Sequence, residues 1–168
     1  MIFSLEHVFR IKSPDILVKK NERTISVENC LSSFTFNDTF EEKIIKCQYC
    51  HKKTNVFNKK SFATLPKYLI MLMSRGMKDK FNCHVKFEEN FDLDPSYLNV
   101  KGIEKEKNTN YTLLGGTILY GYGYGHAVAF CKHFGENYYI FNDISFKRID
   151  LNEIKKENIY LLFYKKNE

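Results

Sequence analysis

The sequence predicts a β-rich α+β domain in which one helix precedes a mainly antiparallel set of strands. Aromatic residues make up 15% of the 168 residues, with 15 Phe, 11 Tyr and no Trp, and such residues are enriched in strands. The apolar content of 43%, with only 3 Pro, indicates a packed globule rather than a disordered chain. No linker or internal repeat divides the sequence, so we expect one domain over 1–168.

One stretch near the amino end has helical periodicity. In Ser26–Phe34, apolar side chains recur at positions 27, 30, 31 and 34. Ser26 suits the N-cap, and Asn29 stands where a capping box usually has Glu. The preceding stretch, Met1–Arg23, shows no regular pattern and is expected to be irregular. We therefore predict a helix that begins at Ser26.

Most of the remaining sequence consists of short apolar runs separated by turns, which favours strands. The continuous run Tyr68–Met73 is typical of a strand buried on both faces. Gly115-Gly116 interrupts a longer run and predicts a bulge or kink. Gly102–Asn110 is highly charged and predicts an exposed loop, and Asp150–Glu157 predicts a helical turn. The other predicted strands are Ser61–Thr64, Phe81–Phe87, Phe91–Leu93, Tyr111–Tyr120, Phe146–Ile149 and Ile159–Tyr164.

The stretch Gly121–Asp143 predicts a β-hairpin with chemistry at its open end. If the hairpin folds about Phe134, His126 lies opposite Asn142 or Asp143. An imidazole oriented by an amide or carboxylate is the base half of a nucleophilic triad. A half-exposed histidine and ordinary turn residues are the alternative interpretation. The three glycines before His126 favour the functional one, because they allow movement or close backbone approach.

Charge and hydropathy argue against two classes of protein. The formal net charge is +6, but the basic residues are mostly Lys, lie throughout the chain and are mixed with 20 acidic residues. A nucleic-acid binder would more often cluster Arg and Lys with aromatic residues, so Glu41–Lys60 is interpreted as a solvated face. No apolar run is long enough to span a bilayer, and Met1–Phe9 lacks the features of a secretory signal. We expect a cytoplasmic or nuclear protein that binds neither nucleic acid nor membrane.

The five cysteines do not predict a disulfide framework or a complete metal site. Their number is odd, and no secretory signal accompanies them. Cys47-Gln-Tyr-Cys50 is one C-x-x-C pair, half of a zinc ribbon, whereas a structural zinc ion takes four ligands. His51 is too close to Cys50 in sequence to complete the tetrahedron readily. We therefore expect no metal or cofactor.

Read in order, the sequence resembles the carboxy-terminal half of a ubiquitin-specific protease catalytic domain, the peptidase family C19 of ubiquitin carboxyl-terminal hydrolases. The resemblance covers about residues 26–164 and rests on eight stretches in the order of the family. These are Ser26–Phe34, Lys46–Cys50, Leu65–Arg75, Phe91–Tyr97, Tyr111–Leu114, Gly125–Ala129, Phe141–Asp143 and Ile159–Tyr164.

The resemblance implies the palm and fingers of a papain-like cysteine peptidase with few helices. It implies that His126 is the general base, that Asn142 orients it, and that Asp143 supports or replaces that role. The Gly121–Gly125 loop would lie beside the cleft for the Gly-Gly tail of ubiquitin. The reaction would be thiol-dependent hydrolysis of the isopeptide bond after the last glycine of ubiquitin. The implied partner is ubiquitin or a ubiquitinated protein.

Three departures from the family pattern bear on activity. The Asn-x-x-x-x-x-Cys nucleophile box is absent, Cys30 fits a structural helix position, and Cys131 has odd parity relative to His126. The first C-x-x-C of the family is also absent, and Ala127 replaces the usual Tyr after the histidine.

Three hypotheses follow. In the first, the chain is the His/Asn half of a deubiquitinase whose Cys-box lobe is encoded upstream or supplied by a separate chain; alone it would be inactive. The second is a catalytically inactive ubiquitin-binding or scaffold module. The third, a zinc-ribbon nucleic-acid binder, ranks last.

Overall fold

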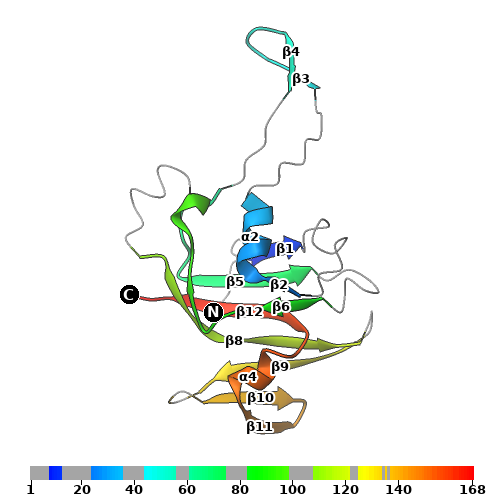
Figure 1. The fold of residues 1–168 in the computed structure, drawn as a ribbon, viewed down its shortest axis with the longest axis vertical. Helices are drawn as coiled ribbons and strands as arrows, with labels where there is room; N and C mark the ends of the chain where they lie inside the picture. The colour runs from blue at the N-terminus through cyan, green and yellow to red at the C-terminus, as the bar shows by residue number, and fades with distance from the viewer. Residues whose placement is uncertain are drawn as a thin grey trace.

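The computed structural model describes residues 8–12, 24–35, 44–55, 61–74, 83–98, 108–121, 125–133, 135 and 137–168. Its centre is an eight-stranded sheet with the order β1-β5-β12-β8-β9-β10-β11, and β7 also pairs with β8 (Figure 1). The strands are β1 (Val8–Lys12), β5 (Tyr68–Ser74), β7 (Asn90–Asp92), β8 (Asn110–Tyr120), β9 (His126–Lys132), β10 (Tyr138–Asn142), β11 (Ser145–Ile149) and β12 (Ile159–Lys166). All their pairings are antiparallel except β1–β5. The predicted β-rich, mainly antiparallel fold is confirmed.

Two small sheets flank the large one. Strand β2 (Thr24–Ser26) pairs in parallel with β6 (His84–Lys86), directly before the helix. Strand β3 (Ile44–Lys46) pairs with β4 (Lys53–Asn55) in a separate hairpin that carries Cys47 and Cys50 at its tip. In Figure 1 this hairpin projects away from the body of the molecule, at the opposite end from β11.

The predicted helix is α2 (Val27–Thr35), and its start follows from a reciprocal cap. The Asn29 backbone N–H donates to Ser26 Oγ (3.1 Å), and the Ser26 backbone N–H donates to Asn29 Oδ1 (3.1 Å). Two backbone donors that a helix start leaves unpaired are thereby satisfied, with Asn in place of the usual Glu. Val27, Cys30 and Leu31 are buried, which confirms the predicted apolar side of the helix.

The core lies on one face of the large sheet. Along β5, Leu69, Met71 and Met73 are buried, whereas Ile70 and Leu72 between them are half-buried. Figure 1 shows α2 near β5, and α4 (Leu151–Ile154) beside β9 and β10, both on the viewer's side of the sheet. The prediction that this strand is buried on both faces is therefore wrong, because the described helices cover only one face.

Gly115 and Gly116 allow three strands to pack closely. A Cβ on Gly115 would lie 2.3 Å from the Phe130 carbonyl oxygen, and one on Gly116 would lie 2.2 Å from the Leu161 carbonyl oxygen and 2.7 Å from the Phe130 ring. The β8–β12 register shifts next to this pair, where Phe163 pairs with Gly115 but Tyr164 pairs with Leu113. The extra residue at 114 is the bulge that the sequence predicted.

The segment between β6 and β7 ties the sheet together through polar contacts. The Tyr164 hydroxyl donates to the Glu88 carbonyl oxygen (2.6 Å), and burial raises the pKa of Tyr164 well above its usual range. Lys132 Nζ (2.8 Å) and the Tyr138 hydroxyl (3.1 Å) both donate to Glu89 Oε1. These two residues are the last of β9 and the first of β10. Glu89 therefore anchors the closed end of their hairpin.

Two local predictions were wrong. Val8–Lys12 is a strand within a stretch predicted to be irregular, and it pairs in parallel with β5. The predicted strand Ser61–Thr64 is reduced to a single bridge between Phe62 and Leu98. The predicted helical turn is shorter than expected, because α4 ends at Ile154. Most of the predicted charged loop, 102–107, lies outside the described residues.

None of the helices in the described ranges is long and apolar enough to cross a membrane.

Candidate active site

The candidate site lies at the open end of the β9–β10 hairpin. His126 is the first residue of β9, and Asn142 is the last residue of β10. Two of the glycines that precede β9, Gly121 and Gly125, lie where other residues would not fit. Gly121 has φ +81°, and a Cβ on Gly125 would lie 2.2 Å from the Tyr120 carbonyl oxygen. Residues other than glycine would be strained at both positions, which agrees with the special role predicted for these glycines.

The register of the hairpin differs from the predicted one. Phe141 pairs with Ala129, and Tyr138 pairs with Lys132. Continuing this register by one residue places Asn142 opposite Val128, so His126 lies two positions farther along β9. The expected direct opposition of His126 and Asn142 is therefore wrong, because the two strands pair about residue 135 rather than about Phe134. The two side chains still share a face of the sheet and meet diagonally.

The structure joins His126 and Asn142 through a short hydrogen bond. His126 Nε2 and Asn142 Oδ1 are 2.6 Å apart. An amide oxygen only accepts, so Nε2 carries the proton and donates. The neutral ring then has its lone pair on Nδ1, and the part of the chain that the structure describes provides no hydrogen-bond partner for this atom. Both side chains are exposed. The pair is thus an oriented imidazole with its basic nitrogen open to an incoming acid.

A two-residue turn between β10 and β11 positions Asn142. Asn142 pairs with Ser145, and the Ser145 hydroxyl donates to the Asn142 carbonyl oxygen (2.8 Å). Asp143 occupies the turn with φ +50°, a conformation that Asp adopts more readily than most residues. The structure gives Asp143 no hydrogen bond or ion pair with any described residue. Of the three predicted site residues, it therefore brings two into contact.

The structure brings no thiol into contact with His126. All five cysteines lie within the described ranges. Cys30 and Cys83 are buried in the core, and Cys131 lies on the sheet face opposite to His126, because side chains alternate along β9. The interpretation of Cys30 as structural and of Cys131 as facing away agrees with these positions.

The remaining two cysteines form a tight turn at the tip of the β3–β4 hairpin. The His51 N–H donates to the Cys47 carbonyl oxygen (2.8 Å), and the Cys47 N–H donates to the Lys52 carbonyl oxygen (2.9 Å). Backbone N–H groups of Cys50 and Tyr49, and then the Cys50 thiol, lower the pKa of Cys47. Within the described ranges no group of three or more His, Cys, Asp or Glu side chains is placed to hold a metal ion.

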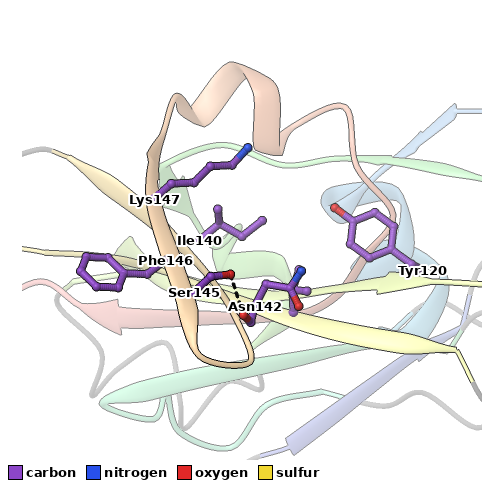
Figure 2. Close-up of a pocket in the computed structure, with 7 residues that line it drawn as sticks. Tyr120, Ile140, Asn142, Ser145, Phe146 and Lys147 are labelled. Carbon is purple, nitrogen blue, oxygen red and sulfur yellow. Dashed lines mark hydrogen bonds between the residues drawn. The ribbon is translucent and has the colours of Figure 1, made fainter.

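A cavity of about 390 Å³ lies beside Asn142. It is lined by Tyr120, Val128, Ile140, Asn142, Ser145, Phe146 and Lys147 (Figure 2). Tyr120 pairs directly with His126, and Ile140 pairs directly with Lys147. Burial, and then the nearby Glu157 carboxylate that accepts its hydrogen bond, raise the pKa of Tyr120. The sequence prediction did not include this cavity. Side chains alternate along 145–149, and this alternation places Lys147 on the same face as Ile140 once the β10–β11 register is known. That alternation is the sequence feature from which the cavity could have been predicted.

Comparison with known proteins agrees with the geometry of this site. The family model of ubiquitin carboxyl-terminal hydrolases matches residues 7–164. The chain is 25% identical over 155 residues to ubiquitin carboxyl-terminal hydrolase 19 of Arabidopsis thaliana, covering 89% of this chain and 23% of that protein. It is 29% identical over 158 residues to ubiquitin carboxyl-terminal hydrolase 8 of Saccharomyces cerevisiae, covering 80% of this chain and 31% of that protein.

Solved structures show the same fold. A SAGA DUB module of Ubp8, Sgf11, Sus1 and Sgf73, bound to ubiquitin aldehyde, superposes with a TM-score of 0.72 at 22% identity, over 96% of this chain and 36% of that one. A related SAGA DUB module bound to monoubiquitin has a TM-score of 0.74 at 22% identity, over 96% of this chain and 35% of that one. The chain thus spans about a third or less of these proteins. With a family match that covers nearly the whole sequence, the chain belongs to the ubiquitin carboxyl-terminal hydrolase family and corresponds to part of a ubiquitin-specific protease catalytic domain.

Proposed function

We propose that this chain supplies the histidine and asparagine of a ubiquitin-specific protease that hydrolyses isopeptide bonds after the carboxy-terminal glycine of ubiquitin. The observation that carries the proposal is the 2.6 Å contact between His126 Nε2 and Asn142 Oδ1. Two structural neighbours are bound to ubiquitin aldehyde and to monoubiquitin, which supports ubiquitin as the partner. We place the protein in the cytoplasm or nucleus, as the sequence suggests.

In the proposed mechanism His126 transfers one proton twice. The nucleophile is a thiol from outside this chain. His126 Nδ1 takes the proton from that thiol. The thiolate attacks the glycine carbonyl, and the imidazolium then gives the proton to the lysine amine as the carbon–nitrogen bond breaks. Water hydrolyses the resulting thioester. Asn142 holds the ring direction and the Nε2–H tautomer throughout.

We assign the nucleophile to polypeptide other than the described residues, since none of the five thiols contacts His126. A Cys-box lobe, on the same polypeptide or on a separate chain, would supply it. In this proposal residues 1–168 form one part of a catalytic domain, and the isolated part hydrolyses no ubiquitin conjugate. Asp143 has a supporting role beside Asn142, or replaces Asn142 in orienting the ring.

The test uses the native protein that contains this sequence, captured from its own cells and assayed on a ubiquitin–fluorophore conjugate. General base catalysis contributes about 10²–10⁴ in rate, so we expect His126→Ala to remove activity to that extent. Asn142→Ala should cause a large loss and Asp143→Ala a smaller one. The exposed His133→Ala, on the closed end of the same hairpin, is the matched control. Retained activity in His126→Ala would contradict the assignment.

The second candidate function is a ubiquitin-binding or scaffold module without catalysis. It is favoured by the same five thiols, none of which reaches the imidazole. Titration of labelled ubiquitin onto the chain tests it. Binding without cleavage, in a native protein whose mass equals the 19.9 kDa of this sequence, would select it over the enzyme. No binding at high micromolar ubiquitin would count against it.

A further inference from the structure

The cavity beside Asn142 has a polarity that selects for a particular kind of ligand. Its apolar surface comes from Val128 and Ile140 at the base of the β9–β10 hairpin. Figure 2 shows the Lys147 side chain and the Tyr120 ring at opposite sides, with Ile140 and Asn142 between them. Its volume of about 390 Å³ lies at the small end of the range for ligand sites, ~300–1,000 Å³. A short side chain with its neighbouring backbone fits such a space.

Two polar side chains that line this cavity carry donors without an acceptor among the described residues. Asn142 uses Oδ1 to accept from His126, and this leaves both N–H bonds of its amide. Lys147 adds an ammonium group, and no carboxylate in the described part of the chain pairs with it. The Ser145 hydroxyl proton is already committed to the Asn142 carbonyl oxygen. A ligand that satisfies Asn142 and Lys147 must therefore present acceptor oxygens.

Tyr120, at the side of the cavity opposite to Lys147, lies near an acidic residue. Burial, and then the Glu157 carboxylate, raise the pKa of Tyr120. An anion entering the cavity is thus directed away from Glu157 and toward Lys147. The donors of Asn142 and Lys147, and the acidic residue near Tyr120, together favour a carboxylate on an apolar stem, with the stem against Val128 and Ile140.

We propose that this cavity is a substrate subsite that binds a glutamate side chain of the polypeptide being processed. The carboxylate accepts from Lys147 Nζ and the Asn142 amide, and the methylene stem covers Ile140. The inference rests on the proposed function for the identity of the substrate, because the same Asn142 would orient the catalytic imidazole on its other side. Lys147 would thereby determine specificity without taking part in proton transfer.

The test uses the chain itself and two blocked tripeptides, N-acetyl-Gly-Glu-Gly-amide and its Gln counterpart, followed through the methyl signals of Val128 and Ile140 by NMR. We expect the Glu peptide to shift both signals and to bind at least about threefold more tightly than the Gln peptide, with the difference shrinking in high salt. Lys147→Ala should abolish the preference, and Lys147→Arg should retain it. Lys156→Ala, an exposed lysine beyond α4, is the matched control.

Equal binding of the two peptides, or methyl shifts that are unchanged in Lys147→Ala, would overturn the proposal. A parallel titration with ubiquitin separates this failure from that of the proposed function. Ubiquitin binding without a Glu preference removes the subsite alone. A Glu preference without ubiquitin binding upholds the pocket chemistry and contradicts the deubiquitinase assignment.

Discussion

Two hairpin ends carry recognisable motifs, and among the described residues one of them brings its motif together as a candidate site. The β3–β4 hairpin brings Cys47 and Cys50 together at its tip, but no third ligand among the described residues joins them. The β9–β10 hairpin brings His126 and Asn142 together within the large sheet, where β8 pairs with β9 and β11 pairs with β10. A cavity lies beside Asn142. The comparison shows that a motif at a hairpin end becomes a site when neighbouring strands fix its geometry.

The largest expected difference between the two hairpins is the effect of truncating one aromatic side chain in each on the free energy of unfolding. Phe130 on β9 is 1% exposed and covers Gly116, whereas Tyr49 on the cysteine turn is 87% exposed. We expect Phe130→Ala to lower the free energy of unfolding by about 3–5 kcal/mol, and Tyr49→Ala to change it by less than about 0.5 kcal/mol. Urea unfolding followed by circular dichroism measures both. Similar costs for the two changes would break the comparison.

The close approach of strands beneath the site should have the next largest effect. Gly116→Ala places a Cβ 2.2 Å from a backbone oxygen, and we expect a loss of about 1–3 kcal/mol from overpacking. The control is Gly135→Ala between β9 and β10, where a Cβ would make only an ordinary contact, 3.8 Å from Asn137 Nδ2, but φ is +82°. Its expected cost is about 1 kcal/mol, from backbone strain alone. Thermal unfolding of the two variants should rank them in this order, and a larger cost at Gly135 would contradict it.

The stability that Glu89 contributes at the closed end of the β9–β10 hairpin should depend on pH. The hydrogen bond from Lys132 lowers the pKa of Glu89 despite the opposing effect of burial, and Tyr138 lowers it further. A carboxyl with a depressed pKa in the folded state contributes stability above its unfolded pKa of about 4.3, and this contribution is lost as the pH falls through the folded value. The stability difference between wild type and Glu89→Gln should therefore shrink as the pH falls below about 4.5. A constant difference from pH 7 to pH 3 would show that Lys132 does not stabilise the charged form.

The smallest effect is expected at the cysteine turn. Backbone N–H groups of Cys50 and Tyr49 and the Cys50 thiol lower the pKa of Cys47, so this thiol should be the one alkylated fastest by iodoacetamide near pH 7. Cys50→Ser should slow the reaction by only a few-fold, because the backbone donors remain. Mass spectrometry of partial digests identifies the labelled cysteine. Faster labelling of Cys131 would contradict the assigned turn geometry.

The sequence was sufficient to predict the parts of the fold that depend on local pattern. The capping box at Ser26, the apolar side of α2 and the bulge beside Gly115 all follow from residues near one another in the chain. The parallel strand Val8–Lys12 did not, because its pairing with β5 joins segments some sixty residues apart. The incomplete burial of Ile70 and Leu72 depends on which face the helices cover, and an apolar run alone does not contain that information.

For the site, the sequence predicted the contact but not its geometry. His126 and Asn142 meet as expected, although the strands pair about residue 135 rather than about Phe134, which shifts the register by two residues and makes the contact diagonal. Ser145 and Lys147 were not predicted as neighbours of the site, because their positions require both the two-residue turn at Asp143 and the pairing of β11 with β10. The role of Asp143 stays a prediction.

The central claim is that Asn142 fixes the His126 ring with its proton on Nε2 and its basic nitrogen open. The most direct measurement is the tautomeric state of His126 by long-range ¹H–¹⁵N NMR on the chain above pH 7.5. We expect a protonated Nε2 in the wild-type chain, and a mixture of tautomers in Asn142→Ala. A proton on Nδ1 in the wild-type chain, or an unchanged tautomer in Asn142→Ala, would contradict it.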